Sequence, residues 1–297
     1  MTVRSCLKSM RIRTLPLSLS GVLTGIALSY EAAQPSPYVI VFLLLTTALL
    51  QILSNLSNEL GDTLHGTDTA DRLGMRYSIQ DGEMSIGQMQ GLIAVIVALC
   101  CLCGLIMVWC SFGTLFTARA IGLLALGAAA IWAAMKYTLG NNPYGYRGLG
   151  DIFVFIFFGL VSVMGAAYVC SHNFKAVWIL PAAAIGCWSI GVLNVNNIRD
   201  MKTDAATRTT VALKLGPRKA RIYQTILITA GWALMAAFSA LSAARWFEWL
   251  YFITSPLFIL HLHGVWTRTG KALDSMLPML VMSTFLTSVL FCVGISV

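Results

Sequence analysis

Two short clusters of carboxylate and amide side chains have the residue types and spacing of a metal site. The first reads NELGD at residues 58–62 and continues to Asp68; the second reads NIRD at residues 197–200 and continues to Asp204. Together they contain five of the 12 acidic residues of the chain. Carboxylate and amide oxygens suit Mg²⁺, which proteins commonly hold with a few carboxylates and the phosphates of a substrate. The two clusters therefore predict a Mg²⁺–diphosphate site.

The first cluster offers three candidate metal ligands. Asn58 and Asp62 are four residues apart, so on a continuing helix they share one face. Two glycines, Gly61 and Gly66, would then let the chain leave the helix. Once outside the helix, the chain would bring Asp68 towards the same metal ion. We therefore expect these three polar side chains to act together.

Charged residues around these ligands extend the first cluster. Glu59 lies three residues before Asp62 and could join it at the metal. Arg72 and Arg76 follow in the same loop. Because a guanidinium group is a fixed cation with several donors, both are candidates to bind the phosphate oxygens of a substrate.

The second cluster repeats this design. Asn197, Asp200 and Asp204 have the spacing i, i+3 and i+7, which places them on one face of a helix. A diphosphate with bridging metal ions needs carboxylates on both sides, and the two clusters lie in different halves of the chain. This arrangement also suggests a duplicated architecture of membrane helices. Three cations near the second cluster are candidates to bind the substrate, Arg199, Lys202 and Arg208, and Lys214 lies close by.

A third polar segment, KYTLGNNPYGYRGLGD at residues 136–151, carries three tyrosines: Tyr137, Tyr144 and Tyr146. Tyrosines are common at membrane boundaries, so these three could form an aromatic belt. Alternatively, their ring faces could stabilise a cationic reaction intermediate in the wall of the site. Arg147 could steer a substrate carboxylate through its two-pronged donor geometry, or it could form an ion pair with Asp151.

The elements that must position these segments are membrane helices. The chain of 297 residues is 58% hydrophobic and 11% charged, with a mean hydropathy of +0.78. An apolar run of about 17 residues is long enough to cross a membrane. We expect an all-α integral membrane protein in which residues 1–297 form a single unit, without a cleavable signal peptide. Nine spans are predicted, at roughly 14–30, 38–57, 88–109, 116–136, 151–170, 177–196, 221–243, 249–264 and 276–296.

The distribution of charge predicts the orientation of these spans. With the N-terminus in the cytoplasm, only Arg119, Lys175 and Arg245 of the 20 basic residues face outward. Cytoplasmic loops of membrane proteins carry an excess of Lys and Arg. We therefore expect a bacterial cytoplasmic (inner) membrane protein whose N-terminus and acidic clusters face the cytoplasm, with the C-terminus on the opposite side.

Other classes of function are disfavoured. The net charge of +8 is spread over membrane-flanking loops and forms no continuous basic stripe, so we expect no nucleic acid partner. Cys100 and Cys103 match a redox spacing but lie in an apolar span, where cysteine behaves as a small hydrophobic residue. A secondary transporter would place its charges near the middle of broken helices, whereas these cluster at one end.

The chain resembles the UbiA superfamily of membrane prenyltransferases. Within it, the chain looks most like the 1,4-dihydroxy-2-naphthoate polyprenyltransferases of menaquinone synthesis. The first acidic motif has a Gly-x insertion before Asp68 that is typical of this branch, and the PYGYRGLGD segment is also specific to it. The resemblance covers nearly the whole sequence through the motifs RTLPLSLSGVLTG, LQILSNLSNELGD, YTLGNNPYGYRGLGDIFVFIFFG, and LNVNNIRDMKTD followed by LKLG.

The resemblance implies a fold and a set of site residues. Nine helices would surround a central cavity open to lipid, with the two acidic motifs facing each other across it. Mg²⁺ and the polyprenyl diphosphate would be held by Asn58, Asp62, Asp68, Asn197, Asp200 and Asp204. The four aspartates, with Tyr137 and Tyr146, would be the catalytic residues.

This chain departs from the pattern of the branch at several positions. Glu59 stands where the branch usually has Asp, and Met75 replaces a usual Pro. Arg76 comes one place early, with Tyr77 in the usual position of the Arg. Arg208 is the counterpart of a family Lys.

The implied reaction joins a polyprenyl chain to an aromatic ring. Mg²⁺ would make the diphosphate a better leaving group, and 1,4-dihydroxy-2-naphthoate would attack the resulting allylic cation. Loss of diphosphate and CO₂ would then give demethylmenaquinone, while the polyprenyl tail stays in the lipid bilayer. Two alternatives are a prenyltransferase for 4-hydroxybenzoate or homogentisate and, in a different class, the secondary transporter.

Overall fold

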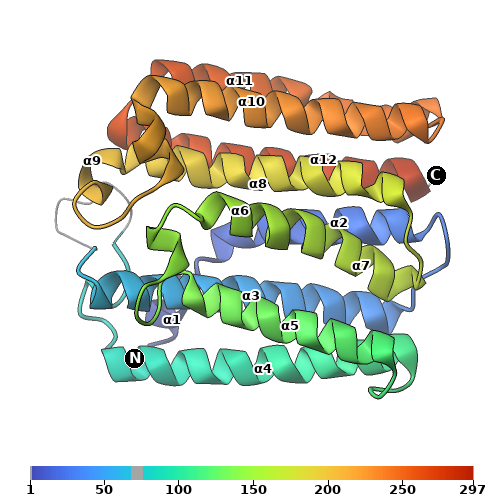
Figure 1. Ribbon diagram of the computed structural model, residues 1–297, viewed down its shortest axis with the longest axis horizontal. Coiled ribbons are helices and arrows are strands. Elements are labelled where there is room, and N and C mark those ends of the chain that lie inside the picture. The colour runs from blue at the N-terminus through green and yellow to red at the C-terminus, as the bar shows by residue number, and fades with distance from the viewer. Residues whose placement is uncertain (1, 68–75, 297) are drawn as a thin grey trace.

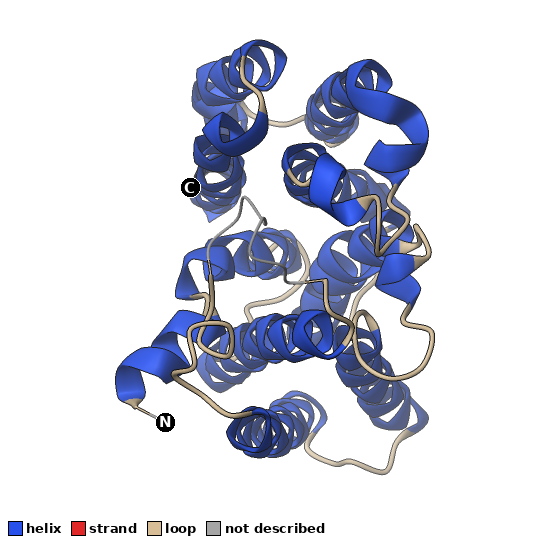
Figure 2. Cartoon of the chain, turned by 90° about the vertical axis from the view of Figure 1, so that its left-hand side faces the viewer, coloured by secondary structure: helices blue, strands red, loops and turns tan. Residues whose placement is uncertain are grey.

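The computed structural model describes residues 2–67 and 76–296, and every regular element in this part of the chain is helical. The helices run roughly parallel to one another along the long axis of the molecule, and Figure 2 views them nearly end on. The first half of the chain contains α1 (Val3–Met10), η1 (Ile12–Thr14), α2 (Leu15–Ser29), α3 (Pro37–Leu64), α4 (Ile86–Phe112), α5 (Ala118–Lys136) and η2 (Tyr144–Tyr146).

The second half of the chain continues with α6 (Gly150–Val154), η3 (Phe155–Val161), α7 (Ser162–Ser171), η4 (Ala176–Trp178), α8 (Ile179–Arg199), α9 (Met201–Asp204), α10 (Val211–Leu241), η5 (Trp246–Thr254), α11 (Ser255–Thr267), η6 (Gly270–Ser275) and α12 (Met276–Ser296). Segments α6, η3 and α7 form one continuous rod that contains a turn of π-helix at η3. Helix α10 is kinked at Gly216–Pro217, because Gly216 has a φ of 75°.

Short polar residues begin the long helices. Ser85 caps α4 by accepting a hydrogen bond from the backbone of Gln88, and Thr117 and Thr210 cap α5 and α10 in the same way. Such caps satisfy backbone N–H groups that the first turn leaves without partners. The apolar runs between the caps then continue as helices, because a helix satisfies every backbone polar group inside a membrane.

Eight helices among the described residues are long and apolar enough to cross a membrane. The remaining predicted segment, at 249–264, is observed as η5 followed directly by α11, and α11 runs beside α10 in Figure 1. The chain is therefore a multi-pass, all-α membrane protein. The predicted first span, 14–30, corresponds to α2, and a short helix that was not predicted, α1, precedes it.

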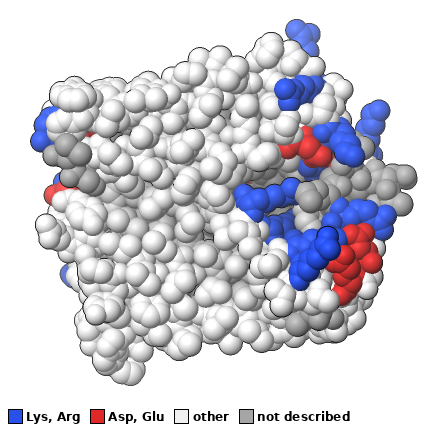
Figure 3. All heavy atoms as spheres, turned by 180° about the vertical axis from the view of Figure 1, so that it is seen from behind, with Lys and Arg blue, Asp and Glu red and all other residues white. Residues whose placement is uncertain are grey.

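The two ends of the molecule differ in charge. Figure 3 shows Lys, Arg, Asp and Glu side chains gathered mainly at one end, with a broad uncharged surface between the ends. Helix α9 and the N-terminus lie at the same end of the bundle, and the C-terminus lies at the other (Figure 1).

Candidate active site

A cavity of about 680 Å³ lies inside the bundle. Helix α3 contributes a stripe of lining residues from Leu43 to Asp62, which spans roughly 28 Å at the rise of an α-helix. Near Leu43 the wall is largely apolar, with Val22, Leu123 and Val169. Near Asp62 it becomes polar. The cavity therefore joins a long apolar compartment to a polar end.

The first acidic motif lies at this polar end. Helix α3 continues through Leu64, so Asn58 and Asp62 share one face as predicted, and both line the cavity. Asp62 is only 3% exposed. Asp68 and Arg72 lie outside the described residues.

Two other interpretations of the first motif are wrong. Glu59 does not join Asp62: its side chain is fully buried, and its Oε1 accepts a hydrogen bond from the backbone N–H of Ile79 at 2.9 Å. Gly61 does not end the helix, because α3 continues to Leu64. A Cβ at this position would lie 2.6 Å from the backbone oxygen of Thr138. This glycine instead lets the chain after α5 pack closely against α3. The chain leaves the helix at Gly66, which has a φ of 66°.

Arg208 connects the two acidic motifs. Its Nε lies 3.1 Å from Oδ1 of Asp204, and its Nη2 lies 3.8 Å from Oδ1 of Asp62. Tyr146 completes the group, because its hydroxyl donates to Oδ1 of Asp62 at 2.7 Å and its ring lies 5.3 Å from the Arg208 guanidinium. The prediction that the motifs face each other is therefore confirmed for Asp62 and Asp204.

Burial and charge set the protonation of this group. Burial raises the pKa of Tyr146, and the neighbouring Asp62 carboxylate raises it further. Tyr146 therefore remains a neutral donor. Burial opposes the charged form of Arg208, but the carboxylates of Asp62 and Asp204 outweigh that effect and raise its pKa. The site thus holds a permanent cation between two carboxylates.

The second motif does not form the single helical face that its spacing suggests. Helix α8 ends at Arg199, and Asp200 lies at the break before α9. Asp200 is almost fully buried and accepts two hydrogen bonds from the Arg199 guanidinium, at 2.8 and 2.5 Å. Arg199 also donates to Asp274 at 2.6 Å. Asn197 and Arg199 line the cavity, as does Asp274 from η6.

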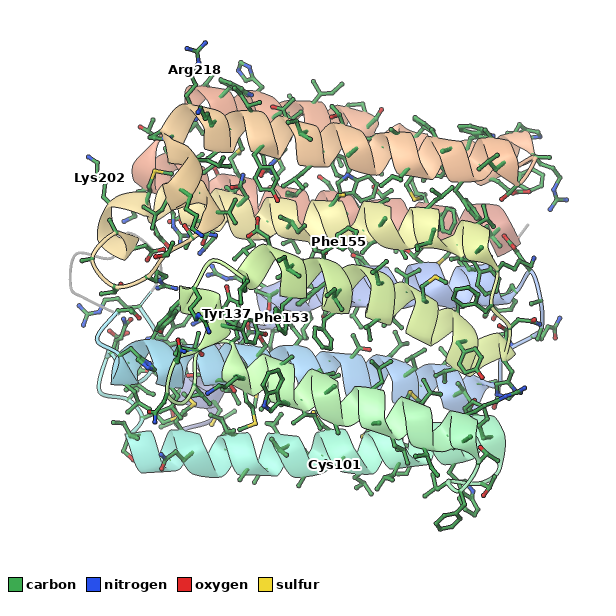
Figure 4. All side chains as sticks on the ribbon, viewed as in Figure 1. Cys101, Tyr137, Phe153, Phe155, Lys202 and Arg218 are labelled. Carbon is green, nitrogen blue, oxygen red and sulfur yellow. The ribbon has the colours of Figure 1, made fainter. Side chains whose placement is uncertain are left out.

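Two of the three predicted tyrosines belong to the cavity wall. Tyr137 and Tyr144 both line the cavity, and Figure 4 shows Tyr137 and Phe153 in the interior of the bundle. Tyr144 donates to the carbonyl of Ala133 at 2.7 Å and stacks on Phe153 with 3.8 Å between ring centroids. Burial raises the pKa of Tyr137 to about 12. These contacts favour the wall over the interfacial belt.

Three predicted substrate-binding cations lie away from the cavity. Arg76 is exposed and forms an ion pair with Asp81 at 3.0 Å. Lys202 is exposed on α9 and projects outward in Figure 4. Arg147 is exposed as well. The predicted Arg147–Asp151 pair is wrong, because Asp151 instead accepts a hydrogen bond from Tyr223 at 3.0 Å.

Several polar residues of the cavity were not identified as site residues from the sequence. Arg11 and Arg13 were used only to predict orientation, although both line the cavity. Unassigned polar lining residues also come from η1, α3 and η6: Thr14, Gln51, Asn55 and Asp274. The spacing of Gln51, Asn55 and Asn58 on one helical face was the available signal. No comparable signal in the sequence marks Arg11 or Asp274, because each side chain reaches the cavity through packing between distant segments.

The donor set at the polar end fits Mg²⁺. Asn58, Asp62, Asn197 and Asp204 offer amide and carboxylate oxygens, the ligand type that Mg²⁺ prefers. No three acidic, His or Cys side chains among the described residues form a ready-made metal cage. Such a cage is not required, because Mg²⁺ usually retains waters and is held by one or two carboxylates with substrate phosphates.

Comparison with known proteins agrees with this geometry. The chain is 38% identical over 291 residues to the 1,4-dihydroxy-2-naphthoate octaprenyltransferase of Escherichia coli (strain K12), covering 97% of this chain and 94% of that protein. Its fold is similar to the apo structure of a UbiA homolog from Aeropyrum pernix K1, with a TM-score of 0.74 and 16% identity over 95% of this chain and 98% of that one.

A UbiA homolog from Archaeoglobus fulgidus bound to GPP and Mg²⁺ is also similar, with a TM-score of 0.65 and 16% identity over 99% of this chain and all of that one. The family model of UbiA prenyltransferases matches residues 18–289. With a match over nearly its whole length, this chain belongs to the UbiA prenyltransferase family.

Proposed function

We propose that this enzyme transfers a polyprenyl group from polyprenyl diphosphate to 1,4-dihydroxy-2-naphthoate in a Mg²⁺-dependent reaction of menaquinone synthesis. The observation that carries the proposal is the group formed by Asp62, Arg208 and Asp204, where both acidic motifs meet at the polar end of a long apolar cavity. A diphosphate needs the polar end, and a polyprenyl chain needs the apolar compartment. The name of the Escherichia coli relative supplies the aromatic substrate.

The residues at the polar end have distinct proposed roles. Mg²⁺, when bound, neutralises developing charge on the diphosphate and makes it a better leaving group. It would be held by Asn58, Asp62, Asp68, Asn197, Asp200 and Asp204. Arg208 would bind the phosphate oxygens directly, because its guanidinium lies close to a carboxylate of each motif. Tyr146 would orient the Asp62 carboxylate through its hydrogen bond.

The proposed reaction balances without an external oxidant. The C–O bond between the allylic carbon and the diphosphate breaks, and the diphosphate leaves with the electron pair. The ring carbon that carries the carboxylate forms the new C–C bond. CO₂ then departs, and its bonding electron pair restores the aromatic ring. The direct product is the hydroquinone form of demethylmenaquinone.

The cavity wall would protect the allylic cation during this reaction. The rings of Tyr137 and Phe153 face the interior, and ring faces attract cations. The apolar residues of α5 and η3 exclude water that would otherwise hydrolyse the intermediate. The polyprenyl tail can remain in contact with the lipid bilayer throughout.

We also propose a bacterial cytoplasmic membrane location in which the acidic motifs and the N-terminus face the cytoplasm and the C-terminus faces outward. The excess of basic residues at the proposed cytoplasmic ends supports this orientation. The position of the N-terminus and α9 at one end of the bundle, opposite the C-terminus, is consistent with it.

The proposal is tested with purified protein in detergent, radiolabelled polyprenyl diphosphate and a panel of aromatic acids. We expect Mg²⁺-dependent transfer to 1,4-dihydroxy-2-naphthoate, with kcat/KM about a hundredfold above that for 4-hydroxybenzoate, a difference of about 2.7 kcal/mol in transition-state stabilisation. Full activity in excess EDTA would contradict the metal requirement. Preference for 4-hydroxybenzoate or homogentisate would assign the enzyme to a different aromatic substrate.

A further inference from the structure

One half-buried cation of the cavity, Arg11, has donors that the described residues do not use. The Nε and Nη2 atoms of Arg11 are buried and have no hydrogen-bond partner within the described part of the chain. Arg11 lines the cavity. A buried charged group without partners is costly, so these donors indicate a missing anionic ligand. The mechanism above does not use this side chain.

The protein holds Arg11 in place from several sides. Its backbone is left-handed, with a φ of 49°, at the sharp turn between α1 and η1. Asn55 of α3 donates to the carbonyl of Met10 and to the Thr14 hydroxyl, each at 2.9 Å. The Thr14 hydroxyl in turn donates to the Arg11 carbonyl at 2.9 Å. The turn is therefore anchored to the cavity-lining face of α3.

The side chain is held in a way that leaves one edge available. The Arg11 guanidinium stacks over the ring of Tyr77, with 3.7 Å between its central carbon and the ring centroid. Stacking occupies a flat face of the guanidinium and leaves its edges open. Nε and Nη2 lie on the same edge, which is the fork that binds a carboxylate with two parallel hydrogen bonds. The unused donors thus fit an anion that presents two oxygens side by side, such as a carboxylate or a phosphate.

An unused acceptor lies in the same cavity. Oε1 of Gln51 is buried without a partner among the described residues, whereas its Nε2 donates to Thr14 at 3.2 Å and to Asn55 at 3.3 Å. Gln51 thus contacts the same Thr14 and Asn55 that anchor the Arg11 turn. A ligand with a carboxylate and a hydroxyl group would satisfy both unused groups.

The position of these groups separates them from the diphosphate site. Asn55, which anchors the Arg11 turn, precedes Asp62 by seven residues on α3, or about 10 Å along the helix. Both sites line one cavity. The two anionic groups of the two substrates would therefore use different cations, Arg208 for the diphosphate and Arg11 for the carboxylate, with the reacting carbons between them.

We propose that Arg11 binds the carboxylate of a hydroxylated aromatic acid through Nε and Nη2, and that Oε1 of Gln51 accepts a hydrogen bond from a ring hydroxyl. This inference rests on the proposed function and replaces Arg147 as the carboxylate-binding residue. It also explains how the product leaves. Once the carboxyl group departs as CO₂, the product no longer carries the charge that Arg11 holds.

The test measures binding without turnover, using the full-length protein in detergent and no prenyl diphosphate. The probes are 1-hydroxy-2-naphthoate and 1-naphthol, which differ by the carboxylate, and binding is followed by isothermal titration calorimetry. We expect the wild type to bind the carboxylate probe at least about tenfold more tightly, equal to about 1.4 kcal/mol. Arg11→Ala should remove this difference, and Arg11→Lys, which keeps the charge but loses the fork, should reduce it.

A matched control and a kinetic measurement complete the design. Arg4→Ala, in helix α1 just before the Arg11 turn but exposed, should bind both probes as the wild type does. In Arg11→Lys the KM for the aromatic acid should rise about tenfold, while the KM for prenyl diphosphate stays unchanged. If Arg11→Ala does not fold, Arg11→Lys alone decides the outcome.

Two results would overturn the assignment. The first is unchanged preference for the carboxylate probe in both Arg11 variants. The second is an equal rise in the KM of both substrates, which would place Arg11 at the diphosphate. The proposed function would fail in a different way. If the wild type binds the carboxylate probe through Arg11 but transfers no prenyl group to naphthoate, the carboxylate site stands and the proposed reaction is refuted.

Discussion

The hydroxyl of Tyr146 offers a precise test of how the acidic site is organised. Tyr146→Phe removes the hydrogen bond to Asp62 at 2.7 Å but keeps the ring beside Arg208. A hydrogen bond to a charged group contributes about 1.5–3 kcal/mol. Loss of a residue that orients a metal ligand typically weakens metal affinity or activity by about 10–100-fold. We therefore expect the Mg²⁺ concentration for half-maximal activity to rise at least about tenfold.

Tyr144→Phe is the matched control for this experiment. Tyr144 lies in the same short helix, η2, and its hydroxyl also makes a buried hydrogen bond, but the acceptor is the neutral backbone carbonyl of Ala133. Its removal should lower the free energy of unfolding by about 1 kcal/mol without changing the response to Mg²⁺.

The assay is prenyl transfer by purified enzyme across a Mg²⁺ titration, with thermal unfolding measured in parallel. An unchanged Mg²⁺ response in Tyr146→Phe would refute the role assigned to its hydroxyl. Equal shifts in both variants would show that the effect comes from general loosening of η2 and not from Asp62.

Three further outcomes are expected. Asp200→Asn should abolish prenyl transfer while membrane insertion and expression persist, and near-normal turnover in excess Mg²⁺ would contradict the role of the second motif. Arg76→Ala and Lys202→Ala should each leave the KM for prenyl diphosphate within about twofold of the wild type, because both side chains lie outside the cavity and exposed charges contribute little; a larger rise would return them to the site. In a cysteine-free background, a cysteine at Thr207 should react with an impermeant thiol reagent only from the cytoplasm and one at Trp246 only from outside; reversed labelling would invert the proposed orientation.

The sequence by itself determined the class of protein and the central parts of the site. Apolar runs long enough to cross a membrane specify helices, because no other open structure satisfies its backbone there. Within one helix, spacing also decides which side chains share a face, so Asn58 and Asp62 were placed correctly. Paired acidic motifs in both halves of the chain indicated that two segments must meet.

Only the tertiary structure decided which charged side chains reach the cavity. Arg208 and Lys202 are both close to the second motif in sequence, yet Arg208 lies between the two motifs and Lys202 is exposed. Helix α8 ends at Arg199, so the spacing from Asn197 to Asp204 crosses a break and no longer describes one face. Spacing predicts neighbours only while a helix continues, and it loses that meaning where the helix breaks.

The remaining site residues come from contacts between segments far apart in the chain. Asp274 reaches Arg199 from η6, and Tyr146 reaches Asp62 from η2. Arg11 enters the cavity because its left-handed turn is anchored to Asn55, 44 residues later in the sequence. Such contacts depend on how helices pack against one another. Local sequence patterns specify each helix, but packing between helices sets which side chains meet.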